Sequence, residues 1–102
     1  MAMLQQIVCR PFTKQGKLHV EFTFKNDDGT VMKITREIVL AKYIVFQTVR
    51  TEECIKCLVY RSPQLKQLIL SVRLRFGKES RTFWQEIDKG TFTIEYDLMR
   101  LN

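Results

Sequence analysis

The chain has 102 residues, of which 45% are hydrophobic and 27% charged, with only four glycines and two prolines. These proportions exclude an extensively disordered, collagen-like or low-complexity protein, and the length predicts a single domain covering 1–102. A formal net charge of +6 permits acidic partners but does not require them.

Alternation of apolar and polar residues predicts a half-buried strand over 18–25. Asn26 to Gly29 has the composition of a tight turn, and the β-branched run 30–35 follows it. We therefore expect a first hairpin. The next segment, 35–42, has the pattern of a short helix with Thr35 as its N-cap, whereas 41–50 is interpreted as a strand because a similar segment, 91–100, alternates cleanly.

The same pattern returns downstream. Segment 62–67 contains Ser-Pro, typical of a helix start with proline at its first position. Segment 68–76 alternates, with Ser71, Arg73 and Arg75 on its polar side. A turn over 77–80 and a return strand over 81–87 complete a second hairpin, and a final strand is expected over 91–98 after a turn at 88–90.

The two halves of the chain align at an offset of about 50 residues and share the same order of strands. We therefore predict a mainly β fold, with α+β as the alternative. In this prediction two similar antiparallel motifs, 4–50 and 55–102, pack in one domain with one or two short helical turns. Chance alternation in an all-β chain is the alternative explanation of the similarity.

No segment has the pattern of a secretory signal or of a helix that crosses a membrane. The N-terminal residues lack a basic start followed by a long apolar run. The most apolar segment, 38–46, is interrupted by Lys42 and is far shorter than the roughly 20 residues that a spanning helix needs. We expect an intracellular protein without a membrane partner.

The three cysteines predict structural thiols. Cys54 and Cys57 form a C-x-x-C motif that, with Cys9 and His19, offers four ligands of the kinds that zinc accepts. Residues three apart on a strand face opposite ways, and no glycine or proline here provides a turn that would bring both thiolates to one metal. We therefore expect no metal and no cofactor. In intracellular proteins of hyperthermophiles, where disulfides occur, Cys9 would pair with Cys54 or Cys57.

A catalytic function is not expected. His19, the chain's one histidine, lies on the polar side of its predicted strand next to Glu21. A catalytic histidine needs a nucleophile or a second acid-base group within reach. Ser71 is the nearest candidate, and no glycine-rich turn beside it suggests an oxyanion hole. We interpret the protein as non-enzymatic.

Taken whole, from Met-Ala-Met-Leu-Gln-Gln at its start to Tyr-Asp-Leu-Met-Arg-Leu-Asn at its end, the chain resembles the small orphan proteins of filamentous viruses of hyperthermophilic archaea, such as the Acidianus filamentous viruses. The resemblance rests on no motif and carries over no site. It implies an intracellular setting, which is the host cytoplasm for a viral protein, together with high thermal stability and no enzyme signature.

One surface has the charge to bind nucleic acid. Arg73 and Arg75 project from the same face of one predicted strand, about 7 Å apart, and Lys25 and Arg81 are expected close to them. Most aromatic residues fall on inward faces, where they are unavailable to stack on bases. The exceptions are Tyr43, Tyr60 and Trp84.

A second surface follows from the predicted repeat. The segments 43–50 and 54–61 join the two motifs and are too apolar on both sides for half-solvated strands, so a groove between the motifs is expected there. An unpaired strand edge in such a groove accepts an extended peptide. The residues expected to contact this partner are Tyr43, Phe46, Arg50, Val59, Tyr60 and Arg61.

The sequence therefore favours an interaction module that binds protein or peptide in this groove. Weak binding of nucleic acid through Lys25, Arg73, Arg75 and Arg81 is the alternative. Either a monomer or a homodimer fits the sequence.

Overall fold

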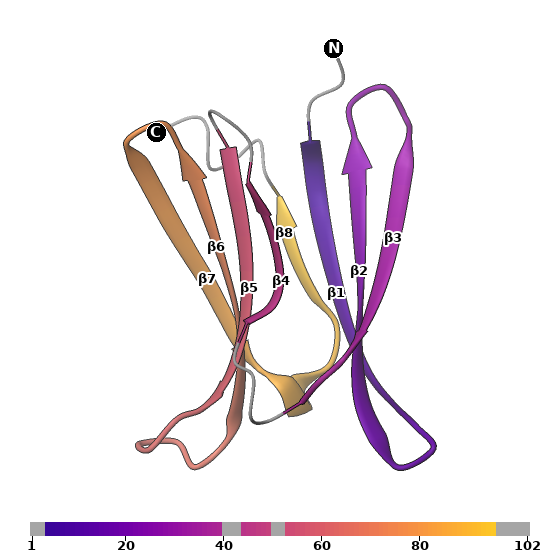
Figure 1. Cartoon of the computed structure of the whole chain (residues 1–102), viewed down its shortest axis with the longest axis vertical. Coiled ribbons are helices and arrows are strands. Elements are labelled where there is room, and N and C mark those ends of the chain that lie inside the picture. The colour runs from indigo at the N-terminus through magenta and orange to yellow at the C-terminus, as the bar shows by residue number, and fades with distance from the viewer. Residues whose placement is uncertain (1–3, 40–43, 50–52, 96–102) are drawn as a thin grey trace. The chain divides into compact units, whose positions relative to one another are not determined.

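A computed structural model describes residues 4–39, 44–49 and 53–95, without the side chains of 44, 46, 48, 49, 53 and 76. These residues form two four-stranded antiparallel sheets, with the strand orders β3-β2-β1-β8 and β4-β5-β6-β7 (Figure 1). The predicted mainly β fold is confirmed. The one helical segment in the described part of the chain, η1 (Ile87–Lys89), has three residues, so no helix there is long and apolar enough to cross a membrane.

The first compact unit comprises Met1–Arg36 and Gly90–Asn102. Its strands are β1 (Leu4–Lys14), β2 (Lys17–Asn26), β3 (Val31–Glu37) and β8 (Phe92–Glu95). The turn between β2 and β3 is the one that the sequence predicts. There the Asn26 amide donates to the Thr30 carbonyl at 2.9 Å, and the Asp28 side chain accepts from the Thr30 amide at 2.9 Å. Hydrogen bonds from the Thr30 side chain and backbone hold the pKa of Asp28 below its ordinary value.

One side of this first sheet forms a buried apolar face. Cross-strand partners lie on the same side of a sheet, and Cys9 is opposite both Phe22 on β2 and Phe92 on β8. The buried apolar residues of the four strands are Ile7, Cys9, Val20, Phe22, Phe24 and Ile94. The alternation predicted for 18–25 is therefore the alternation that the structure shows.

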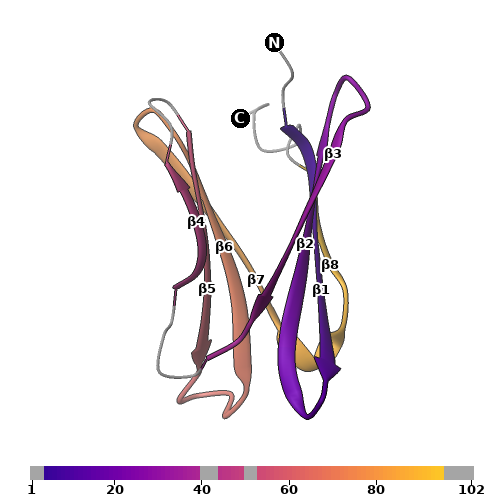
Figure 2. The ribbon, with the colours of Figure 1, turned by 45° about the vertical axis from the view of Figure 1, so that its right-hand side comes forward.

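The second compact unit is Glu37–Lys89. Its strands are β4 (Ile44–Val49), β5 (Glu53–Arg61), β6 (Leu68–Phe76) and β7 (Glu79–Glu86). Its buried apolar face consists of Ile55, Cys57, Val59, Leu70, Val72 and Leu74. The connection 62–67 and the turn at Gly77 and Lys78 lie at opposite ends of this sheet (Figure 2). Those two ends differ in chemistry.

The two units do not follow the expected repeats 4–50 and 55–102. β4 pairs with β5 in the second sheet, whereas the C-terminal strand β8 pairs with β1 in the first. The helix considered for 35–42 is absent from its described part, since β3 continues to Glu37. Segment 62–67 forms a single hydrogen-bonded turn rather than a helix, because the Lys66 amide donates to the Ser62 carbonyl and the chain then enters β6.

Candidate binding face

The side of the second sheet opposite its buried apolar residues carries the candidate site, and we call it the Arg73 face. Four rows of cross-strand partners from β5, β6 and β7 form it: Cys54, Arg75 and Ser80; Lys56, Arg73 and Thr82; Leu58, Ser71 and Trp84; Tyr60, Ile69 and Glu86. The side chains within each row are neighbours, because partners opposite one another lie about 5 Å apart.

Three cations gather at one end of the Arg73 face. Lys56 lies directly opposite Arg73 across the β5–β6 pair, and Arg75 is two residues along β6. Together with Gln47 and Cys54 they line a shallow hollow of about 340 Å³. Among the described residues no carboxylate forms an ion pair with any of the three cations. Their charge is therefore directed at solvent or at a ligand.

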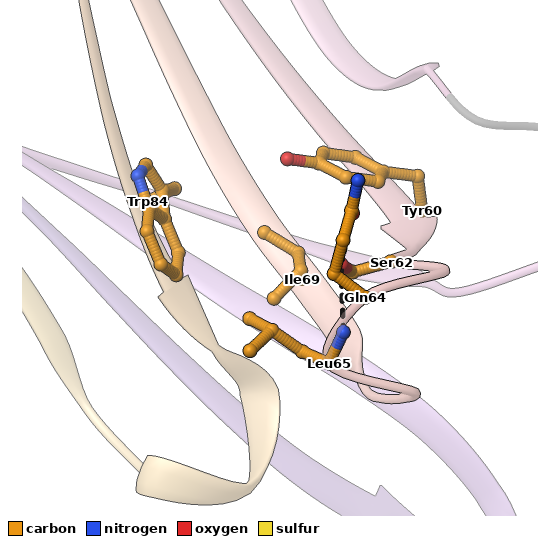
Figure 3. Close-up of a pocket in the computed structure, with 6 residues that line it drawn as sticks. All are labelled: Tyr60, Ser62, Gln64, Leu65, Ile69 and Trp84. Atoms are coloured by element: carbon orange, nitrogen blue, oxygen red, sulfur yellow. Dashed lines mark hydrogen bonds between the residues drawn. The ribbon is translucent and has the colours of Figure 1, made fainter.

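An apolar hollow of about 250 Å³ lies at the other end of the same face. Figure 3 shows Tyr60 and Trp84 on its two sides, with Ile69 between them and Leu65 at the lower edge. Ile69 is 1% exposed, whereas Tyr60 is 39% and Trp84 56% exposed. β6 separates the strands of the two aromatic residues, so these strands are about 10 Å apart, and the two residues also belong to different rows. Each ring keeps an open side.

The connection 62–67 shapes this apolar end. The buried Ser62 hydroxyl accepts a hydrogen bond from the Leu65 amide at 3.2 Å, and the Ser62 amide donates to the Gln67 carbonyl at 2.9 Å. Pro63 fixes the backbone angle directly after Ser62, which favours this turn. The result holds Leu65 as an exposed apolar residue beside Ile69, so the turn adds to the hollow instead of closing it.

Charge divides the Arg73 face into two ends. Within its four rows the one acidic residue is Glu86, at the apolar end. The Lys89 ammonium lies 4.0 Å from the Glu86 carboxylate and partly offsets its charge. A polyanion is therefore attracted to the Lys56, Arg73 and Arg75 end, while the Tyr60 and Trp84 end offers apolar and aromatic contacts.

The residues predicted to bind nucleic acid are only partly brought together. Arg73 and Arg75 are exposed on one face, as the sequence predicts. Arg81 is opposite Leu74 and therefore lies on the other side of the sheet, because cross-strand partners share a side. Lys25 is on β2 in the other compact unit and is no part of this sheet.

The residues predicted to bind a peptide do not form one surface in the described part of the chain. Tyr60 is exposed on the Arg73 face, whereas its neighbour Val59 is 5% exposed and belongs to the apolar core, so Val59 faces no groove. Arg61 is exposed at the end of β5. Tyr43, Arg50 and the side chain of Phe46 lie outside the described residues. The expected groove between segments 43–50 and 54–61 is replaced by strand pairing, because β4 and β5 are hydrogen-bonded neighbours.

The cysteines are free thiols on different faces. Cys54 and Cys57 lie on opposite sides of β5, with Cys57 fully buried and Cys54 half-buried in the cationic hollow. Burial also raises the pKa of Cys9 to about 12. In the described ranges, no three His, Cys, Asp or Glu residues are grouped so as to hold a metal ion.

His19 and Ser71, the two residues considered for a catalytic role in the sequence analysis, lie in different compact units. His19 stacks on Phe12 with ring centroids 5.4 Å apart, and its Nδ1 lies 2.9 Å from the Lys17 carbonyl. Ser71, expected on the polar side of its strand, is only 4% exposed because Leu58 and Trp84 flank it in the same row.

Sequence reasoning missed Lys56, Ile69 and Leu65 as members of the site. Lys56 is a lone cation in the apolar segment 54–60, and only the β5–β6 register puts it opposite Arg73. The Ser62-Pro63 pair was the available signal for this segment. It indicated the start of a helix, whereas the structure has a turn that holds Leu65 beside the hollow.

No protein-family model, curated protein or solved structure matches the chain. The resemblance to proteins of archaeal filamentous viruses, the intracellular setting and the thermal stability that it implies stay predictions.

Proposed function

We propose that the protein is an interaction module whose Arg73 face binds single-stranded nucleic acid. In this proposal Lys56, Arg73 and Arg75 contact phosphates, and the open rings of Tyr60 and Trp84 stack on bases. The observation that carries it is that Tyr60 and Trp84, the exposed aromatic residues of the described part of the chain, lie on the same side of one sheet as Lys56, Arg73 and Arg75. Proteins that bind single strands without strong sequence preference combine these same two features.

The preference for a single strand follows from the apolar end. Bases in a duplex are paired and stacked within the helix, so a flat sheet surface reaches chiefly their phosphates and groove edges. Unpaired bases have free faces, and stacking on an aromatic side chain contributes about 1–3 kcal/mol per base. Tyr60 and Trp84 therefore favour a single strand over a duplex with the same phosphates.

The extended peptide that the sequence favours is the competing partner. The apolar hollow suits an apolar side chain, but the pairing of β4 with β5 closes the edge between segments 43–50 and 54–61 where the peptide was expected to pair. The three cations would also be left without a role by an apolar peptide. Nucleic acid uses both ends of the face.

A binding measurement with a matched charge control tests the proposal. We expect a fluorescently labelled thymidine oligonucleotide to bind at low salt, with log K falling against log salt with a slope of about −2 if three phosphates are contacted. The double variant Arg73→Glu with Arg75→Glu should lose at least tenfold in affinity. The control is Lys14→Glu with Lys17→Glu, which removes an exposed cross-strand lysine pair of the first unit and changes the net charge equally.

Equal losses in the two double variants would overturn the proposal, because they would show a general charge effect. Failure of the wild type to bind any oligonucleotide at low salt would also overturn it. Binding of acidic or apolar peptides in place of oligonucleotides would assign the face to a protein partner.

A further inference from the structure

We infer that the bound strand runs parallel to β6 across about six nucleotides and is contacted through its bases at one end of this footprint only. This inference rests on the proposed function and adds a direction, a length and a division of contacts to it. It follows from where the cations and the rings lie along the strands rather than from their presence alone.

The direction follows from the order of the four rows on the Arg73 face. A strand that crosses the sheet perpendicular to β6 meets a single row, which contains cations or the apolar hollow but not both. A strand parallel to β6 passes from the row of Arg75, through the row of Arg73, to the row of Ile69. Only this path reaches both ends of the face.

The length follows from strand geometry. Arg75 and Ile69 are six residues apart on β6, as are Cys54 and Tyr60 on β5. Six residues of a β-strand span about 20 Å. A single strand with the rise of about 3.4 Å per nucleotide found in stacked DNA covers that distance in about six nucleotides.

The division of contacts follows from what each end lacks. No aromatic residue belongs to the two rows that contain Arg73 and Arg75, so bases there have no ring to stack on. The apolar end has no cation in its two rows, and the charge of its carboxylate, Glu86, is only partly offset by Lys89. Base contacts are therefore confined to the Tyr60 and Trp84 end, and phosphate contacts to the opposite end.

An abasic scan of a thymidine hexamer tests this inference, with one base removed at a time and every phosphate kept. We expect removal of either of two neighbouring bases near one terminus to lower affinity at least fivefold. Removal at the phosphate-contacting end should change affinity less than twofold. In the Trp84→Ala protein one of the two large effects should disappear, and in the Tyr60→Ala protein the other, which gives the polarity of the strand on the sheet.

Three other outcomes would overturn this inference, and they show whether the proposed function fails with it. Equal losses at every position, with tight binding retained, would overturn the one-ended footprint but leave nucleic-acid binding in place. Losses that are unchanged in both alanine variants would also overturn it. A wild-type protein that does not retain the unmodified hexamer at low salt would overturn both.

Discussion

Lys56 and Arg73 lie directly opposite each other across the β5–β6 pair, on the same side of the sheet. Like charges at such positions destabilise a sheet, whereas favourable cross-strand pairs contribute about 0.2–1 kcal/mol. Two cations placed side by side therefore lower the stability of the free protein, and a polyanion bound across them relieves the repulsion.

This pair gives a prediction in which stability and binding change in opposite directions. Arg73→Thr should increase the free energy of unfolding by up to about 1 kcal/mol, because the repulsion with Lys56 is removed, while oligonucleotide affinity falls. Urea unfolding measures the first effect and anisotropy the second. Arg75→Thr is the control, since Arg75 is opposite Cys54 and Ser80 and donates to the Gly77 carbonyl at 3.2 Å. A loss of stability in Arg73→Thr as large as in the control would contradict the interpretation.

Cys54 provides a chemical probe of the cationic hollow. Cys9 and Cys57 are 0% exposed, while Cys54 is half-buried among Lys56, Arg73 and Arg75. In the folded protein we expect a thiol reagent to modify one cysteine quickly, and Cys54→Ser to abolish that fast phase. Saturating oligonucleotide should slow the modification several-fold, measured by mass spectrometry. Unchanged labelling in the presence of bound oligonucleotide would place the ligand elsewhere.

Burial of Cys9 makes stability depend on alkaline pH. Its pKa is raised from an ordinary value of 9.0 to about 12 in the folded protein. Above pH 9 the unfolded thiol ionises while the folded one keeps its proton, so stability is complete below that pH and is lost between about pH 9 and 12. A shift of three pKa units corresponds to about 4 kcal/mol at most.

The test of this pH effect is a comparison of slopes, because lysines and tyrosines also titrate in this range. Cys9→Ala lowers stability at every pH by removing a buried side chain, but its unfolding free energy should fall less steeply from pH 9 to 11 than that of the wild type. Identical slopes would show that Cys9 does not control the alkaline limit.

Val59 and Tyr60 are adjacent in the chain and have opposite surroundings, which makes a paired substitution informative. Val59→Glu buries a charge in the apolar core and should cost about 4 kcal/mol or more, enough to unfold the domain. Tyr60→Glu should leave the protein folded, with a change of about 1 kcal/mol or less, and should weaken oligonucleotide binding. Circular dichroism and anisotropy read out the two effects. A folded Val59→Glu protein would contradict the β5 register.

The local parts of the fold were predictable from the sequence. Alternation over 18–25 and 68–76, with turns at Gly29 and Gly77, indicates hairpins because the period of a strand and the composition of a turn are short-range features. The pairing of β4 with β5 and of β8 with β1 was not predictable, since it joins segments by long-range contacts that no local pattern encodes.

The candidate site was harder to predict because it depends on register. The turn between β6 and β7 consists of Gly77 and Lys78, which puts Ser80 opposite Arg75 and Arg81 opposite Leu74. The turn expected over 77–80 is two residues longer, which changes the partner of Arg81 but not its face, because the faces of a strand alternate with a period of two. Proximity in the hairpin suggested Arg81, whereas its face excludes it from the site. Segment 57–60 is apolar throughout and shows no alternation, which is why Val59 and Tyr60 were not distinguished.

Trp84 is the chain's single tryptophan, and its fluorescence therefore reports directly on the proposed stacking surface. The decisive measurement titrates the protein at low salt with a thymidine hexamer and with a hexamer that has the same phosphates and no bases. If Trp84 stacks on a base, the thymidine hexamer quenches its emission in parallel with binding, while the abasic hexamer binds more weakly and leaves the emission nearly unchanged. Equal quenching by both oligomers, or binding of the thymidine hexamer with no change in emission, would contradict the claim that the Arg73 face binds single-stranded nucleic acid through its bases.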